Sequence, residues 1–347
     1  SAQTMSNSFR KLVCTKLGTD FRQVTKVVDV PHIHRNDVPR GHLLVRNKFV
    51  GINASDINYT AGRYAPGVKP PFDVGFEAVG EVVAHNNDTH FHAGQKVGVV
   101  SFGAFSEYQL VHQRQAFPIP DAVPQILPLL VSGLTASIAL EQVGEMKIGD
   151  TVLVTAAAGA TGAFAVQLAK QAGCRVFGTC SSEEKVQELL NLGCDRPINY
   201  TKESVKAVLR SECPDGVDIV YESVGGEMYE TCVNALATHG KLIIIGFLSG
   251  YQDEGGWTGE GGGSASPLPP RLLRKSASVR GFFLNDFHRL WPQHIQELAF
   301  KVARNELQPL LDPTRFKGLE SIADAVEHMY EKKNVGKIVV ELPQTDV

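Results

Sequence analysis

Residues 152–170 read VLVTAAAGATGAFAVQLAK, and this stretch decides the fold of the chain. Apolar residues, then small ones, then a run with helical period predict a strand, a tight turn and a helix. Across the turn, Ala156, Gly159 and Gly162 form an A-x-x-G-x-x-G pattern. Small residues let backbone N–H groups approach a pyrophosphate, and a helix N-terminus favours its negative charge. We therefore predict a dinucleotide site that includes Ala158, although a plain structural turn is the alternative.

The rest of the chain divides into a β-rich part and an α/β part. Strand-like runs at 42–50, 78–83, 96–100 and 107–111 come first and are separated by Gly, Pro and Asn. A helix is expected at 126–141. From there the expected strands are 151–155, 175–179, 217–221, 241–247 and 278–283, and the expected helices are 161–172, 183–192 and 227–238. Repeated βα units indicate a doubly wound parallel sheet covered by helices. A last strand at 337–340 can return to the first domain, so we predict one domain of residues 1–125 and 310–347 and another of residues 126–309.

Composition excludes several classes of protein. The chain has 347 residues, 43% of them hydrophobic, and a formal net charge of −3, so nothing favours nucleic acid or an anionic membrane as a partner. We see no uninterrupted apolar stretch long enough to span a bilayer. The six cysteines form no C-x-x-C pair, which favours reduced thiols in an intracellular protein.

The end of the second expected strand of the α/β part, T-C-S-S at 179–182, bears on the choice between NADH and NADPH. NAD enzymes usually place an acidic residue about 20 residues after the glycines to bind the ribose hydroxyls, and none stands here. Ser181 and Lys185 offer a hydroxyl and a positive charge, which suit a 2′-phosphate, and Tyr200 adds a donor. In the alternative, Ser181 caps the next helix and Lys185 is solvated, because Glu183 and Glu184 also suit a helix start. We favour NADPH.

Several motifs resemble the medium-chain dehydrogenase/reductase superfamily over nearly the whole chain. They are VGINASDINYTAGRY at 50–64, PPFDVGFEAVGEVV at 70–83, AAGATG at 157–162 and KNVGKIVV at 333–340. The resemblance implies an N-terminal, β-rich, GroES-like catalytic domain and a Rossmann cofactor domain. Further runs, YESVGG at 221–226, GFLSGYQ at 246–252 and KSASVRGFFL at 275–284, are similar to the quinone oxidoreductase and prostaglandin reductase branch.

The zinc ligands of the superfamily's alcohol dehydrogenases are missing. In those enzymes a Cys follows the first of these strands and a His stands in a G-H-E motif. Here Asn53 and Phe76 occupy the two positions, Glu77 remains, and Ser132 stands near the third ligand. A carboxylate alone does not make a tetrahedral N/S zinc site, so we predict no metal.

The resemblance also implies which residues meet the cofactor. Around the adenosine phosphates it places Thr161, Ser181, Lys185 and Tyr200. Along the nicotinamide half it places Asn53, Ser223, Ile245, Tyr251, Phe282, Phe283 and Leu284. Asn334 matches the family's cofactor-binding residue before the final G-K. For Ile245 and Phe283, a simple core position is an equal alternative.

Without a strong Lewis acid, an activated double bond is easier to reduce than a simple ketone. We expect hydride to add to the β-carbon of an α,β-unsaturated ketone, charge to reach the carbonyl oxygen as an enolate, and the α-carbon to take a proton. The resemblance implies a lipid enone substrate, with 15-oxo-prostaglandins expected. Candidate catalytic residues are Asn53 and the hydroxyls of Tyr59, Tyr64 and Tyr251, although such tyrosines also serve as pocket walls. Tyr251 is expected on a mobile Gly/Ser/Pro-rich loop, 250–270, that can close over substrate.

Three alternatives remain: an NADPH:quinone reductase, a zinc alcohol dehydrogenase and a non-enzymatic NADPH-binding protein. The absence of a basic stripe argues against nucleic acid. The resemblance implies a homodimer formed through the strand at 276–283, unless that edge is covered by its own chain. It also implies the peroxisome, with the cytoplasm as alternative because the chain shows no terminal S-K-L.

Overall fold

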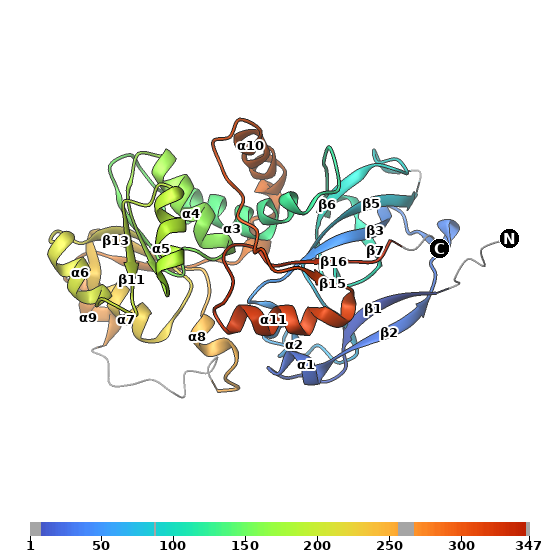
Figure 1. The fold of residues 1–347 in the computed structure, drawn as a ribbon, viewed down its shortest axis with the longest axis horizontal. Helices are drawn as coiled ribbons and strands as arrows, with labels where there is room; N and C mark the ends of the chain where they lie inside the picture. The colour runs from blue at the N-terminus through green and yellow to red at the C-terminus, as the bar shows by residue number, and fades with distance from the viewer. Residues whose placement is uncertain (1–7, 87, 256–266, 345–347) are drawn as a thin grey trace. The chain divides into compact units, whose positions relative to one another are not determined.

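The protein was analysed as a computed structural model that describes residues 8–86, 88–255 and 267–344 (Figure 1). It forms two compact units. Unit 1 comprises Ser1–Val131 and Leu311–Val347, and unit 2 comprises Ser132–Leu310. The predicted boundary at 125/126 lies six residues before the first division, and the one at 309/310 lies one residue before the second.

Unit 1 contains two sheets. The larger has seven strands in the order β15-β16-β3-β5-β6-β8, with β7 also paired to β3. These strands are β3 (His42–Gly51), β5 (Glu77–His85), β6 (Lys96–Val100), β7 (Tyr108–His112), β8 (Ala116–Pro118), β15 (Phe316–Lys317) and β16 (Val339–Glu341). The smaller has the order β2-β1-β4, formed by β1 (Ser8–Cys14), β2 (Thr25–Pro31) and β4 (Phe72–Asp73). Three helices accompany the sheets: α1 (Phe21–Val24), α2 (Asp56–Thr60) and α11 (Ile322–Tyr330).

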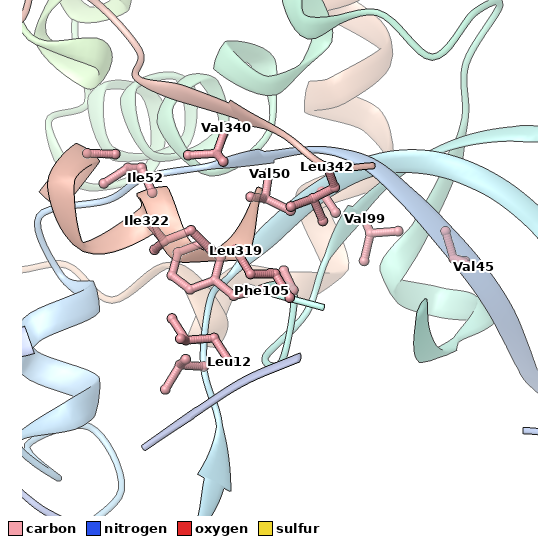
Figure 2. Packing of buried hydrophobic residues seen from close by; sticks show 14 of the residues in the cluster. Leu12, Val45, Val50, Ile52, Val99, Phe105, Leu319, Ile322, Val340 and Leu342 are labelled. Carbon is pink, nitrogen blue, oxygen red and sulfur yellow. The ribbon is translucent and has the colours of Figure 1, made fainter. Parts of the chain in front are cut away.

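Both ends of the chain build the core of unit 1. Figure 2 shows Leu12 and Phe105 near Leu319, with Val340 and Leu342 beside Val50 of β3. Each such side chain contributes roughly 1.5–3 kcal/mol when fully buried. The predicted return of the last strand to the first domain is confirmed, because Val340 pairs with Val50 in β3.

Unit 2 is a six-stranded parallel sheet in the order β11-β10-β9-β12-β13-β14. Its strands are β9 (Thr151–Val154), β10 (Arg175–Cys180), β11 (Arg196–Asn199), β12 (Val217–Glu222), β13 (Leu236–Ile244) and β14 (Ser278–Gly281). The order reverses between β9 and β12, which is the switch point where open α/β sheets bind ligands. The doubly wound fold predicted from the repeated βα units is confirmed.

Helices connect the strands of unit 2, and one more helix, α10, follows the last strand. They are α4 (Ala160–Gln171), α5 (Glu183–Asn191), α6 (Val205–Glu212), α7 (Gly226–Ala235), α8 (Leu248–Tyr251), α9 (Leu268–Leu273) and α10 (Trp291–Ala303). Helices α4 and α5 contact β9, β10 and β11, whereas α7 contacts β12, β13 and α6. Figure 1 shows α4 and α5 close together and α6 next to α7. Crossovers between parallel strands are right-handed, so the reversal of strand order puts these two groups of helices on opposite faces.

Three predictions need correction. Residues 236–238, expected at the end of a helix, belong to β13. This strand ends at Ile244 and not at residue 247, because the N–H groups of Ile245 and Gly246 donate to the carbonyl oxygen of Glu222. The helix expected at 126–141 is a composite of η3 (Pro124–Leu129), α3 (Val131–Ile138) and a π-turn, η4 (Ala139–Val143). Together, Pro124–Val143 are apolar and long enough to cross a membrane, contrary to our expectation, but most of this segment is buried inside the protein, as in a core helix.

Candidate cofactor and substrate sites

The glycine-rich turn joins β9 to α4 in unit 2. Ala156 has a φ of +48°, and the N–H of Ala157 donates to the carbonyl of Thr179 in β10 over 2.9 Å. Gly159 is the N-cap of α4. The N–H groups of a first helical turn have no partner within the helix, so this N-terminus favours an anion at the carboxyl edge of the sheet.

Gly162 is required for this arrangement. A Cβ atom there would lie 2.5 Å from the carbonyl oxygen of Ala156 and 2.8 Å from the Cα of Ala157. Both are backbone atoms, so relieving the clash would require the turn itself to shift. Gly159 is less constrained, since its Cβ would meet only the Ala156 oxygen, at 3.2 Å. The third small residue of the pattern therefore lets the helix pack directly on the turn.

Thr161 points its side chain into the protein. Its hydroxyl donates to the carbonyl of Ser132 over 3.2 Å and shares a hydrogen bond of 2.6 Å with the hydroxyl of Tyr221. Burial raises the pKa of Tyr221. The Thr161 hydroxyl is therefore engaged inside unit 2, which leaves its backbone N–H as the group that an anion at the start of α4 could use. Sequence reasoning missed Tyr221, because it sits in an apolar strand with no polar signal around it.

The structure brings the predicted 2′-phosphate residues together. The Lys185 Nζ donates to the Ser181 Oγ over 3.4 Å, and the N–H of Tyr200 donates to the carbonyl of Cys180 at the end of β10. The N-cap of α5 is Ser182, whose hydroxyl accepts from the Lys185 N–H, so the alternative role of Ser181 as the cap is wrong.

Glu183, one of the two acidic residues that precede Lys185, is already paired. Glu183 accepts a hydrogen bond of 2.9 Å from Asn199 and lies 3.1 Å from Lys202, and these partners lower its pKa. The negative charge of Glu183 is thereby compensated by Lys202, which follows β11. The end of β10 keeps a hydroxyl and an ammonium group, which fit a phosphate and not the two hydroxyls of an unmodified ribose.

Ser223 follows β12 at the switch point. Its N–H donates to the Thr155 hydroxyl over 2.9 Å, but its own hydroxyl oxygen is buried with no hydrogen-bond partner among the described residues. A buried hydroxyl without a partner costs roughly 1–3 kcal/mol, which a ligand at this strand end would relieve. This orphaned atom fits the predicted contact with the nicotinamide half of a dinucleotide.

Glu222 shapes the loop that carries Ser223, and sequence reasoning did not single it out. Its buried carboxylate accepts hydrogen bonds from the N–H groups of Val224 and Gly225 and from the hydroxyl of Thr155. Burial raises the pKa of Glu222. These bonds hold the loop after β12 in one conformation.

Tyr251 is not on a mobile loop, and that prediction is wrong. It ends the short helix α8 and is only 4% exposed. Helix α8 is tied to the loop after β12, since the N–H of Leu248 donates to Ser223 and that of Ser249 to Val224. Of the remaining loop residues, 256–266 lie outside the described residues and 268–270 begin α9. Tyr251 is therefore a fixed part of the Ser223 region.

The predicted residues after β14 differ in exposure. Phe282 donates its N–H to Ile244 and stacks on Phe287 with ring centroids 5.1 Å apart. The Leu284 carbonyl accepts from the Trp291 indole over 3.3 Å. Phe283 is 41% exposed, so the alternative that it is a core residue is wrong. Ile245 is half-buried, and its N–H donates to Glu222.

Unit 1 contains a buried polar cluster of Asn53, Asp56, Glu77 and Lys337. The Lys337 ammonium pairs with Glu77 and donates to the Asn53 Oδ1 over 2.8 Å. The Asn53 Nδ2 donates to Glu77 over 3.0 Å and to the Gly51 carbonyl over 3.5 Å. Both amide hydrogens of Asn53 are thus committed inside unit 1, and only its Oδ1 can serve a further ligand, as an acceptor.

The backbone leaves no spare room in this cluster. A Cβ at Gly51 would lie 2.4 Å from the Glu77 Oε1 and 2.7 Å from the Lys337 Cε. Asp56 accepts from the Asn53 N–H over 2.8 Å, and its other oxygen has no partner among the described residues. Burial raises the pKa of Asp56 to about 8, so it holds a proton at neutral pH. The cluster then carries one positive and one negative charge, which compensate each other.

The other predicted residues of unit 1 have partners outside the polar cluster. The Tyr64 hydroxyl accepts a hydrogen bond of 3.1 Å from the buried amide of Asn58, a residue that sequence reasoning missed. Tyr59 stacks on Phe102 with ring centroids 4.6 Å apart, and burial raises its pKa. Asn334, just ahead of the cluster lysine, donates its side-chain N–H to the Gly336 carbonyl.

Comparison with known proteins identifies the family. Residues 39–121 match the alcohol dehydrogenase GroES-like domain, and residues 160–300 match the zinc-binding dehydrogenase family. Prostaglandin reductase-3 of Mus musculus is 52% identical over 97% of this chain and 90% of its own length. The chain belongs to the medium-chain dehydrogenase/reductase superfamily.

Other members of the superfamily agree with this placement. A probable quinone oxidoreductase of Leishmania amazonensis is 43% identical over 97% of this chain and 98% of its own length. A mycobacterial protein solved in complex with NADPH superimposes with a TM-score of 0.83 at 26% identity, covering 96% of this chain and all of that one. The predicted pairing of a GroES-like domain with a Rossmann domain is confirmed.

The zinc in the family's name does not fit the residues present. Asn53 has no thiolate, its Oδ1 already accepts from Lys337, and Phe76 has no ligating atom. Glu77 is engaged by Lys337 and, at its second oxygen, by the N–H of Val131 over 2.9 Å. Within the ranges 8–86, 88–255 and 267–344, no group of three or more His, Cys, Asp or Glu is arranged to hold a metal. An ammonium group thus stands beside Glu77, where it would repel a metal cation.

Proposed function

We propose that this chain is an NADPH-dependent reductase of α,β-unsaturated ketones, acting on the C=C bond of lipid enones such as 15-oxo-prostaglandins. The observation that carries the reaction class is the pairing of Lys337 with Glu77, which puts an ammonium group and not a Lewis-acid metal at that carboxylate. Without such an acid, an activated double bond is easier to reduce than a simple ketone. The substrate class is supported by the 52% identity to a protein named prostaglandin reductase-3.

The residues of unit 2 fit NADPH. The α4 N-terminus and the turn ending at Gly162 suit the pyrophosphate, Ser181 and Lys185 suit the 2′-phosphate, and the orphaned hydroxyl of Ser223 suits a polar group of the nicotinamide half. When bound, NADPH supplies the hydride. The carbonyl oxygen of Glu222 and its carboxylate hold the flanking loops rigid, so these groups are positioned before the cofactor arrives.

Reduction of an enone puts negative charge on the substrate's carbonyl oxygen, which O–H or N–H donors stabilise. Asn53 is not such a donor, because both of its amide hydrogens are committed to Glu77 and Gly51. Tyr64 is a candidate, since Asn58 donates to its oxygen and its proton therefore points to another acceptor. Tyr59 and Tyr251 are further candidates. We expect turnover to fall but not to vanish when any one of these three tyrosines is changed to phenylalanine.

A second function, NADPH:quinone reduction, is favoured by the relative from Leishmania amazonensis named a probable quinone oxidoreductase. A panel of a 15-oxo-prostaglandin, 3-nonen-2-one and 1,4-benzoquinone, each with NADPH and with NADH, tests the two functions. Our proposal expects the highest kcat/KM for the enones with NADPH. Turnover of the quinone alone would establish the second function, and a preference for NADH would contradict the role of Lys185.

We also propose that two copies assemble through β14. This strand is the edge of the unit 2 sheet, and an exposed edge with free N–H and C=O groups invites pairing with another strand. Val279 and Arg280 in this strand are only half-buried. Light scattering of the purified protein should give twice the mass of one chain, and a monomer at micromolar concentration would contradict the proposal.

A further inference from the structure

Two tight turns in unit 1 are locked together by their backbones. The N–H of Ser101 donates to the Phe76 carbonyl over 2.9 Å, that of Gly103 to Gly75 over 3.0 Å, and that of Phe105 to Val74 over 2.9 Å. These bonds hold residues 74–76 against residues 101–105. The positions of Phe76 and Phe102 are therefore set by main-chain hydrogen bonds and not by loose side-chain packing.

Glycine is required in both turns. Gly75 has a φ of +94° and Gly103 a φ of +90°, a region that other residues rarely adopt. In addition, a Cβ at Gly75 would lie 2.6 Å from the backbone nitrogen of Phe105. The chain thus uses two special backbone positions to present two phenylalanines.

Four rings meet at these turns and form what we call the aromatic platform: Tyr59, Phe72, Phe76 and Phe102. Tyr59 stacks on Phe102 with ring centroids 4.6 Å apart and planes 17° apart. Phe76 lies edge-on to both, at 5.7 and 5.4 Å, and Phe72 lies edge-on to Tyr59 at 5.1 Å. Although its ring is part of this stack, Phe102 remains 41% exposed.

The aromatic platform adjoins the buried polar cluster. Phe76 precedes Glu77, and helix α2 begins at Asp56 of the cluster and carries Tyr59 of the platform. Both groups are therefore built on the same two segments of unit 1. In place of the metal-ligating histidine of zinc-dependent relatives, the chain has a ring of this platform at position 76.

The electrostatics of the platform favour an uncharged ligand. Asp73 contributes to raising the pKa of Tyr59 and is paired with Lys11 over 2.7 Å. A carboxylate brought next to Tyr59 would be repelled by Asp73 and would gain no unpaired cation from Lys11. Apolar chain lying on the rings, in contrast, gains about 25 cal/mol for each Å² removed from water.

We propose that the aromatic platform binds the uncharged hydrocarbon chain of the substrate, and that Phe102 thereby makes the enzyme selective for long-chain over short-chain enones. The proposal rests on the enone reductase function proposed above and names the part of the substrate that unit 1 recognises. Phe102 is a specificity-determining residue in this account, and it takes no part in bond making.

The test compares 3-nonen-2-one with 3-penten-2-one, which share the reacting group and differ only in chain length. For Phe102→Ala we expect kcat/KM to fall about tenfold on the long enone, as loss of roughly half of a phenylalanine's burial would give, and to change less than twofold on the short one. The matched control is Phe300→Ala, an exposed phenylalanine of α10 in unit 2, which should leave both values unchanged.

A binding measurement that needs no turnover accompanies the kinetics. Inhibition by 2-nonanone, the saturated product, should weaken about tenfold in Phe102→Ala and be restored largely by Phe102→Leu. If the two enones lose the same factor, or neither loses any, the platform proposal is overturned while the reductase function stands. If the wild-type protein reduces no enone but shows quinone turnover, the reductase function itself fails, and the platform proposal fails with it.

Discussion

The ammonium group of Lys337 donates a hydrogen bond of 2.8 Å to the side-chain oxygen of Asn53, and both side chains are buried. The same ammonium pairs with Glu77, which in turn accepts from the Asn53 amide. This closed triangle fixes which way the Asn53 amide is turned. It also compensates the Glu77 charge, which would otherwise be buried alone.

Removal of one member of the Lys337–Glu77 pair should be costly. Lys337→Met leaves the Glu77 carboxylate without its counter-charge, so we expect the free energy of unfolding to fall by about 3–5 kcal/mol. The double variant Lys337→Met/Glu77→Gln should recover part of that loss, because no buried charge is left. Urea unfolding measures both values, and a double variant that is less stable than Lys337→Met would contradict the pairing.

Asp56 should make stability depend on pH. Its pKa is raised to about 8 in the folded protein, against about 3.9 in an unfolded chain. The folded state therefore holds a proton that the unfolded state has lost, and this contribution to stability, complete below about pH 4, is lost as pH rises through about 8. Asp56→Asn mimics the protonated acid at all pH values. The Tm of Asp56→Asn minus that of the wild-type protein should therefore increase from about pH 5 to about pH 9. A difference that stays constant over this range would contradict the raised pKa of Asp56.

Lys185 should distinguish the two nicotinamide cofactors. Lys185→Ala removes the charge beside Ser181, so we expect KM for NADPH to rise about 10–100-fold, the equivalent of a charged hydrogen bond of about 1.5–3 kcal/mol. KM for NADH should change little. Lys206→Ala, on the exposed face of α6, is the control. Equal losses with both cofactors would place the 2′-phosphate elsewhere.

Substitution of Ser223 should leave the stability of the cofactor-free protein intact but weaken the binding of NADPH. Ser223→Ala removes a buried hydroxyl that has no partner in the described structure, so the cofactor-free protein should keep its Tm or gain in Tm. The Kd for NADPH should rise about 2–10-fold, because one net hydrogen bond of about 0.5–1.5 kcal/mol is lost. Thermal unfolding with and without NADPH measures both. A lower Tm without cofactor would mean that the hydroxyl already has a partner.

The features that could be predicted from the sequence are those formed by residues close together in the chain. The turn at 156–162 was predictable because strand, small residues and helix follow each other directly. The meeting of Ser181 with Lys185 was predictable for the same reason, since they lie one helical turn apart at a strand end. Tyr251 was placed wrongly, because Gly-rich composition indicates a loop, whereas hydrogen bonds to Ser223 and Val224 fold this segment as α8.

What the sequence could not predict depends on residues far apart in the chain. Lys337 and Glu77 are separated by most of the chain, and nothing near Lys337 marks it as buried. Phe102 meets Tyr59 only because two glycine turns pair their backbones. The role of Tyr221 could not be predicted either, because a tyrosine in an apolar strand is usually a core residue. Only the structure shows the hydrogen bond between its hydroxyl and that of Thr161.

We expect the chain to transfer hydride to the carbon–carbon double bond of an enone, with an ammonium group and no metal at Glu77. The most direct measurement uses NADPH deuterated on the transferred position with 3-nonen-2-one, after dialysis against a strong chelator, and locates the label by NMR. We predict that dialysis against the chelator leaves turnover of the labelled cofactor to 2-nonanone unchanged, and that deuterium appears on the β-carbon. Deuterium on the carbonyl carbon of an alcohol product, or activity that returns only when zinc is added, would contradict it.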